Sequence, residues 1–91
     1  MSTEKSYTLE LTEEAMSDLE RLDKSVAARV LQRLERLADN ATVVRHIALT
    51  GPLKGLYKLR IGDYRALYRL EHEIRVIVVE IIGHRRDVYD E

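Results

Sequence analysis

The spacing of apolar residues changes along the chain, and each spacing predicts one kind of element. In residues 6–11 apolar and polar positions alternate, which predicts a first strand. In residues 12–40 the apolar positions recur every three or four residues, which predicts helices. Alternation returns in residues 56–61 and 64–70, and residues 74–82 are almost continuously apolar, as is typical of a central strand. The order β-α-α-β-β-β predicts an α+β fold in which two helices pack on a small, mostly antiparallel four-stranded sheet.

The helical region divides into two helices at its polar residues. Thr12 is a predicted N-cap, and the two glutamates that follow it suit the positive end of a helix dipole. Asp23 or Ser25 is the predicted cap of the second helix, and Asp39-Asn40 is its predicted end. The two helices are expected to run antiparallel and to pack on the sheet through shared apolar stripes, which are Ala15, Leu19 and Leu22 in the first and Val26, Val30, Leu34 and Leu37 in the second. Residues 41–55 are expected to be a connection without regular structure.

Gly62-Asp63 separates two alternating segments and suits a two-residue type II′ hairpin loop. With that loop, Ile61 pairs with Tyr64 and Arg60 lies directly opposite Arg65. The face away from the helices then carries Lys58, Arg60, Arg65, Leu67 and Arg69, with no carboxylate on the same face of the hairpin. Like charges directly opposite each other destabilise a sheet. The cluster either protects a sheet edge from association or forms a site for phosphate, and the second interpretation is favoured.

Composition is that of a soluble globular protein, with 45% hydrophobic and 34% charged residues in a single expected domain covering residues 1–91. No apolar stretch is long enough to span a membrane, and the polar first residues predict no secretory leader, so we expect a cytoplasmic protein. The formal net charge is −1, yet residues 45–69 contain six basic residues and one acidic residue. This local excess indicates either an anion site or, as composition alone favours, a solvated and salt-bridged surface. Arg29, Arg33 and Arg36 on the second helix form either a basic strip or, as we rather expect, a salt-bridged surface.

The sequence contains no motif that would bind a metal or a cofactor. There is no cysteine, and the three histidines lie in separate segments without ligand spacing. There is also no glycine-rich phosphate loop. We therefore expect neither a metal nor a cofactor.

Two segments together resemble the RelE-type toxins of the RelE/ParE superfamily. The first is the hairpin Leu53-Lys54-Gly55-Leu56-Tyr57-Lys58-Leu59-Arg60-Ile61-Gly62-Asp63-Tyr64-Arg65-Ala66-Leu67-Tyr68, and the second is the tail Ile82-Gly83-His84-Arg85-Arg86-Asp87-Val88-Tyr89. The resemblance covers nearly the whole chain and implies the RelE-like fold. It implies a toxin of a type II toxin–antitoxin system that cleaves mRNA in the A site of the 70S ribosome without a metal.

In the reaction that the resemblance implies, the RNA 2′-hydroxyl attacks the adjacent phosphate and leaves a 2′,3′-cyclic phosphate and a 5′-hydroxyl. Tyr89 matches the general base, and Arg85 matches the arginine that assists the leaving group. Arg65 matches a phosphate-stabilising arginine, and Lys58 a lysine that steadies the transition state and lowers the pKa of the tyrosine. Nearby cations favour phenolate, which makes an otherwise weakly acidic tyrosine usable as a base at neutral pH. Further contacts with RNA or phosphate are predicted at Lys54, Arg60, Arg69, His84 and Arg86.

The resemblance also implies a cognate, RelB-like antitoxin, and operator DNA bound only through the antitoxin complex. Two alternatives remain open at this point. One is a ParE-type toxin that inhibits gyrase, which has the same fold but a protein target. The other is an attenuated toxin that acts mainly in antitoxin binding and autorepression.

Overall fold

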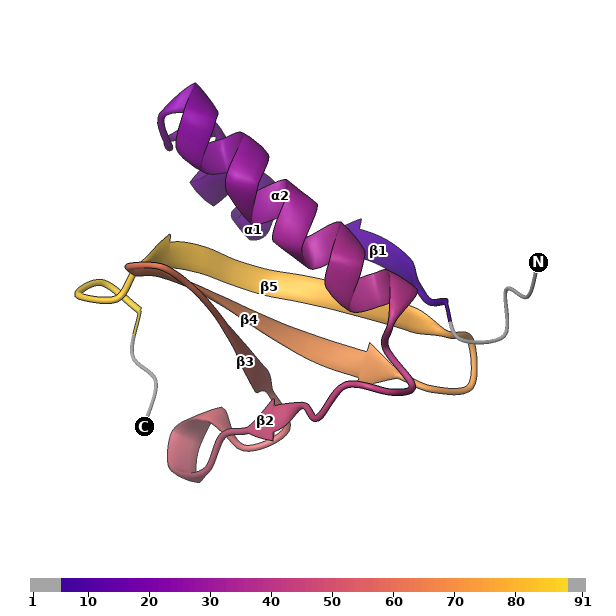
Figure 1. Cartoon of the computed structure of the whole chain (residues 1–91). Coiled ribbons are helices and arrows are strands. Elements are labelled where there is room, and N and C mark those ends of the chain that lie inside the picture. The colour runs from indigo at the N-terminus through magenta and orange to yellow at the C-terminus, as the bar shows by residue number, and fades with distance from the viewer. Residues whose placement is uncertain (1–5, 89–91) are drawn as a thin grey trace.

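A computed structural model of the protein describes residues 6–88 (Figure 1). In chain order its elements are β1 (Thr8–Leu11), α1 (Glu13–Glu20), α2 (Lys24–Asp39), β2 (Ile47–Ala48), the short 3-10 helix η1 (Gly51–Leu53), β3 (Tyr57–Ile61), β4 (Tyr64–Glu71) and β5 (Val76–His84). Neither α1 nor α2 has the length and apolar character needed to cross a bilayer. The elements form two layers, because both α-helices lie over one face of the sheet (Figure 1).

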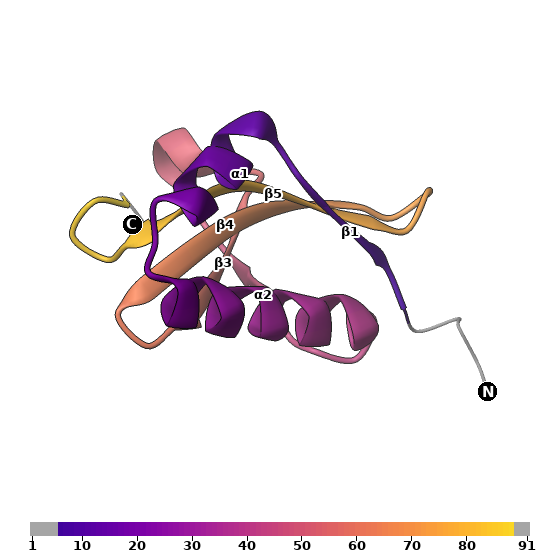
Figure 2. The ribbon, with the colours of Figure 1, turned by 90° about the horizontal axis from the view of Figure 1, so that it is seen from above.

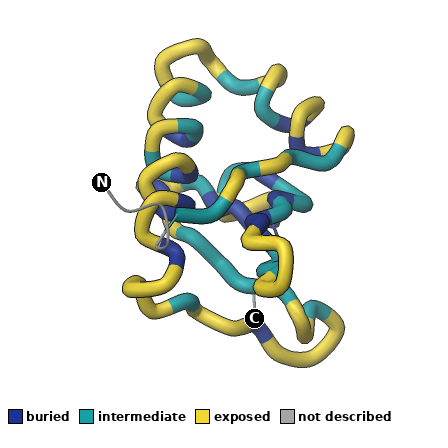
Figure 3. The backbone as a smooth tube through the Cα atoms, turned by 90° about the vertical axis from the view of Figure 1, so that its right-hand side faces the viewer, coloured by how far each residue is buried: buried dark blue, intermediate teal, exposed yellow. Residues whose placement is uncertain are grey.

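The sheet has the order β1-β5-β4-β3-β2. Strand β1 is parallel to β5, and all other neighbours are antiparallel. The two α-helices run in opposite directions across the sheet (Figure 2). Between the layers lies the main core, in which Val30 and Leu34 of α2 meet Ala66, Ile77 and Val79 of the sheet with no exposed surface. Figure 3 shows these buried positions recurring along α2 and along the strands.

The predicted α+β fold is confirmed, with one strand more than expected. Residues 41–55 are not wholly irregular, because β2 pairs with β3 and η1 follows it. The helix boundaries agree closely with prediction: Thr12 caps α1 through its side chain, and Asn40 follows the end of α2. The last strand begins at Val76 rather than at residue 74, because Arg75 adopts the left-handed conformation (φ 57°) in the turn before it.

A second, smaller core lies on the face of the sheet away from the helices. Leu67 of β4 points to that face, where Leu49 and Val88 cover it, and Leu53, Leu56 and Ile81 pack around them. Leu67 is therefore buried and does not lie on an open surface among the cations. Leu49, in the segment before β3, and Val88, at the end of the described tail, thus cover the same strand, β4.

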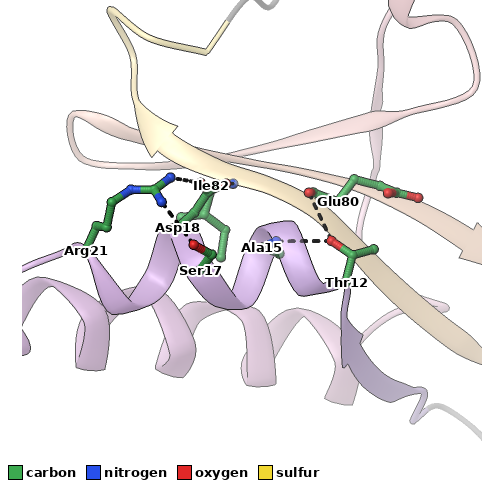
Figure 4. Close-up of polar contacts among 7 residues, drawn as sticks. All are labelled: Thr12, Ala15, Ser17, Asp18, Arg21, Glu80 and Ile82. Atoms are coloured by element: carbon green, nitrogen blue, oxygen red, sulfur yellow. Dashed lines mark hydrogen bonds and ion pairs between the residues drawn. The ribbon is translucent and has the colours of Figure 1, made fainter.

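Helix α1 completes the outer edge of β5 beyond the end of β1. Strand β1 pairs with β5 only as far as Val79, so the following backbone groups need other partners. Thr12 Oγ1 donates to the carbonyl of Glu80 (3.2 Å), and Asp18 Oδ2 accepts the amide of Ile82 (3.0 Å), as Figure 4 shows. Arg21 donates to the other oxygen of Asp18 at 2.5 Å. These bonds fix the part of β5 that leads into the tail.

Candidate functional site

The β3–β4 hairpin has the predicted turn and register. Ile61 pairs with Tyr64, and Arg60 lies opposite Arg65. Gly62 has φ 58°, whereas Asp63 is not among the described residues with positive φ. A positive φ at the first loop residue only is the signature of a type II′ turn, and this geometry needs a glycine there. The prediction that two arginines face each other across this hairpin is confirmed.

Arg60 and Arg65 differ in their surroundings. Arg60 lies on β3 and is exposed, and it forms no ion pair with another residue in the range 6–88. Arg65 lies between β3 and β5, opposite both Arg60 and Gly83, and only 7% of its surface is exposed. Its Nη1 donates to the carbonyl of Tyr64 at 3.2 Å. The guanidinium group of Arg65 is thus held in place before any ligand binds.

The tail after β5 forms a compact turn beside the hairpin loop. The amide of Arg85 donates to the carbonyl of Asp63 (2.7 Å). The amides of Asp87 and Val88 both donate to the carbonyl of His84 (2.8 and 3.1 Å), and the amide of Arg86 donates to Nδ1 of the same histidine (3.1 Å). The Arg85 side chain is exposed, and the hydrogen bond from its amide to Asp63 fixes its backbone beside the β3–β4 loop.

Val88 holds this turn against the sheet, a role that was not predicted from the sequence. Its side chain is 94% buried in the second core. A Cβ placed on Gly83 would lie 2.9 Å from Cγ2 of Val88, so only glycine at position 83 allows this packing. The sequence signal was an isolated apolar residue in a charged tail. Tyr89, the predicted general base, follows directly in sequence and lies outside the described residues.

The remaining predicted residues occupy different places. His84 is half-buried, its ring lies edge-on to Tyr64 (centroids 5.4 Å apart), and Nδ1 is occupied by the Arg86 amide. Lys58 is half-buried near the start of β3, and Lys54 is exposed in the connection after η1. Arg86 is exposed in the tail turn. Arg60, Arg65 and Arg85 are therefore the predicted cations that the fold gathers around the hairpin loop.

Arg69 lies toward the opposite end of β4 and is held by carboxylates. It forms ion pairs with Glu71 and with Glu80, the second at 2.5 Å. The hydrogen bond to Glu80 is the main reason that the pKa of Arg69 is raised. The prediction that this face of the hairpin carries no carboxylate is wrong, because β4 extends to Glu71. A register shift between Leu67 and Tyr68 also brings Glu80 of β5 beside Arg69.

Within residues 6–88 no group of three or more histidine or acidic side chains is arranged to hold a metal ion. The chemistry available at the hairpin loop is that of fixed guanidinium groups. Such groups bind phosphate and stabilise negative charge that develops on it.

Comparison with known proteins identifies the family. A profile described as "ParE toxin of type II toxin-antitoxin system, parDE" matches residues 9–89. The chain is 30% identical over 83 residues to Toxin RelG of Mycobacterium tuberculosis, covering 91% of this chain and 95% of RelG. It is 28% identical over 88 residues to a putative RelE-like toxin protein of Escherichia coli, covering 92% and 90% of the two chains.

Solved structures agree in fold. A chain in the crystal structure of the toxin–antitoxin complex RelBE2 from Mycobacterium tuberculosis superposes with a TM-score of 0.82 at 30% identity, covering 96% of this chain and 100% of that one. The isolated Escherichia coli RelE toxin gives a TM-score of 0.72 at 21% identity, covering 87% and 84%, which supports the fold alone. The chain is therefore a toxin of a type II toxin–antitoxin system and belongs to the RelE/ParE superfamily.

Proposed function

We propose that this toxin is a ribosome-dependent mRNA endoribonuclease that acts in the cytoplasm without a metal. The observation that carries the proposal is the position of three arginines around one loop. Arg60 and Arg65 face each other across the hairpin, and the Arg85 backbone is hydrogen-bonded to the same hairpin at Asp63. Like charges in such proximity destabilise the free protein, and a bound phosphate removes that repulsion.

The proposed reaction assigns one task to each group. The phenolate of Tyr89 takes the proton of the RNA 2′-hydroxyl, whose oxygen then attacks the adjacent phosphorus. The bond to the 5′-oxygen breaks, which leaves a 2′,3′-cyclic phosphate, and the departing oxygen takes a proton from solvent water to become a 5′-hydroxyl. Arg65, already fixed by burial and by its bond to Tyr64, stabilises the charge on the phosphoryl oxygens, and exposed Arg85 stabilises the leaving oxygen. Lys58 favours the phenolate form of Tyr89 and supports the transition state.

The second proposed partner is a RelB-like antitoxin. The M. tuberculosis relative of this fold was solved in a toxin–antitoxin complex, and so was the Escherichia coli RelBE pair. We infer that the antitoxin of this chain binds operator DNA and carries the toxin with it. Lys54, Arg60, His84 and Arg86 are proposed to contact RNA when the antitoxin is absent, whereas Arg69 is engaged by Glu71 and Glu80 and is expected to contribute least.

The test is primer extension on an mRNA translated by purified ribosomes. The wild-type protein is expected to produce cuts within codons, and Tyr89→Phe and Arg85→Ala are each expected to reduce cleavage by about a hundredfold or more. Arg69→Ala is the control, because it removes an arginine of the same sheet that Glu71 and Glu80 already engage, and it is expected to reduce cleavage by less than about threefold. Full cleavage by both Tyr89→Phe and Arg85→Ala would overturn the assignment.

Gyrase inhibition is the second candidate, because the matching family profile is described as a ParE toxin. It predicts DNA breaks that depend on gyrase when the toxin is induced, while mRNA stays intact. Measuring both products in the same induced culture separates the two functions.

A further inference from the structure

His84, the last residue of β5, caps the turn that follows it. Its carbonyl accepts the amides of Asp87 (2.8 Å) and Val88 (3.1 Å), and its ring nitrogen Nδ1 accepts the amide of Arg86 (3.1 Å). An N-cap residue holds the first turn of a helix in the same way, with a side-chain acceptor for one free amide and a carbonyl acceptor for the next ones. The tail turn therefore depends on His84 through both its main chain and its ring.

The hydrogen bond from Arg86 fixes the protonation state of the His84 ring. A backbone amide only donates, so Nδ1 presents a lone pair and the neutral ring carries its proton on Nε2. The ring of Tyr64, the cross-strand partner of His84, lies edge-on to the imidazole, with centroids 5.4 Å apart and the planes at 76°. This contact restrains the imidazole in the orientation in which Nδ1 faces the Arg86 amide.

Three anchors hold the tail turn, and one of them can titrate near neutral pH. The first is the hydrogen bond from the Arg85 amide to the Asp63 carbonyl, and the second is the packing of Val88 in the second core. Neither changes its protonation state near neutral pH. The third anchor is the imidazole of His84, and histidine is the side chain that ordinarily changes charge between pH 5 and pH 8. Protonation places a hydrogen on Nδ1, so the ring can no longer accept the amide of Arg86.

The titratable and charged groups that face His84 come from α1, from β4 and from the tail turn itself. They are Glu14, Asp18 and Arg21 of α1, which line a cleft of about 450 Å³ together with His84, Tyr64 of β4, and Arg85, Arg86 and Asp87 of the turn. The charge of Asp18 is compensated by its ion pair with Arg21. The remaining carboxylates favour a charged imidazole, and the two arginines of the turn oppose it. Because these influences offset each other, the hydrogen bond that only the neutral ring accepts decides which form of His84 holds the turn.

We propose that His84 is a positioning residue: its neutral ring holds the turn that joins Arg85 to Tyr89, and its protonation loosens that turn. The inference rests on the proposed function for the roles of Arg85 and Tyr89. Cleavage then requires two deprotonations, one at His84 to order the turn and one at Tyr89 to form the base. Activity is therefore expected to fall more steeply on the acid side than the tyrosine base alone requires.

The test compares His84→Asn with His84→Ala by primer extension on purified ribosomes between pH 5.5 and pH 8. Both variants lose the imidazole and any contact it makes with RNA, but asparagine keeps an acceptor that does not titrate. His84→Asn is expected to cleave about threefold faster than His84→Ala or more at every pH. The ratio of the wild-type rate to the His84→Asn rate cancels the pH dependence of the ribosome and of Tyr89. This ratio is expected to fall by about threefold or more from pH 8 to pH 5.5.

NMR of the full chain tests the cap without a substrate. At pH 8 the ¹⁵N resonances of the His84 ring are expected to show an unprotonated Nδ1. On acidification the methyl resonances of Val88 are expected to shift as the turn loosens, and in His84→Asn they are expected to stay in place.

A rate ratio that does not change with pH would overturn the inference. So would a ratio that rises at low pH, since a charged imidazole that binds an RNA phosphate would produce that rise. Equal cleavage by His84→Asn and His84→Ala would also overturn it, because only the asparagine can accept the amide. Absence of cleavage by wild type, with the expected NMR titration, contradicts only the proposed nuclease. Cleavage by wild type, with Val88 resonances that do not respond to pH, contradicts this inference alone.

Discussion

The two ends of strand β4 carry arginines on the same face, but only one of these arginines has its charge compensated by carboxylates. At one end Arg65 faces Arg60 across the hairpin. At the other end Arg69 lies between Glu71 and Glu80 and is paired with both. The second arrangement is a structural ion pair, in which the charge is already compensated. The first costs stability in the free protein, and we attribute that cost to a site that binds phosphate.

The largest expected effect is a loss of mRNA cleavage, and it is expected at the Arg65 end of β4 but not at the Arg69 end. Arg65→Ala is expected to reduce mRNA cleavage by about a hundredfold or more, since it removes a fixed cation from the transition state. Arg69→Ala is expected to reduce it by less than about threefold. Primer extension on purified ribosomes measures both. Because Arg65 is buried, Arg65→Lys and the urea midpoint of each variant show whether lost activity reflects lost folding, and equal losses at Arg65 and Arg69 would remove the distinction.

The Arg65 end also depends on the opposite edge of β5, where Asp18 accepts the amide of Ile82. Asp18→Ala leaves that buried amide without a partner and is expected to lower the free energy of unfolding by about 1–3 kcal/mol. Urea denaturation measures this loss. Ser17→Ala, at the neighbouring position of α1, is the control, because it removes only an exposed bond to Arg21. A neutral result for Asp18→Ala would mean that α1 does not hold this edge.

The tail turn at the Arg65 end can be tested by a double-mutant cycle. Gly83→Ala places a methyl group against Val88 and is expected to cost about 1–3 kcal/mol of stability together with part of the cleavage activity. Combined with Val88→Ala, which removes the clashing methyl group, it is expected to cost less than the sum of the two single changes. Additive losses would show that the two residues do not interact.

The smallest effect is expected at the Arg69 end. Glu71→Gln removes one of two carboxylates from a half-exposed ion pair and is expected to change stability by less than about 1 kcal/mol. The effect should shrink as salt is added, because partly exposed charges are screened. Denaturation at low and high salt checks this. A loss as large as that of Asp18→Ala would mean that Arg69 is a major stabilising tie.

The predicted parts of the site depend on residues close together in the sequence, whereas the unpredicted parts depend on contacts between residues far apart in the sequence. The hairpin register followed from Gly62 and from alternation over a few residues, and it was confirmed to the residue pair. The partners of Arg69 were missed because Glu80 reaches it through a register shift between strands, which alternation does not reveal. Likewise, β2 was missed because a two-residue strand has too few positions to show a period.

The sequence by itself determined the α+β fold, the helix caps, the hairpin and the family resemblance, because each depends on local spacing or on a contiguous motif. Only the tertiary structure decided which cations are neutralised and which are not. It paired Arg69 with two carboxylates, buried Arg65, and left the α2 arginines without the salt-bridged surface that we expected for them, as far as residues 6–88 extend. The physical reason is that the electrostatic state of a side chain depends on neighbours brought by other strands and helices. Those neighbours become known only when the chain has folded.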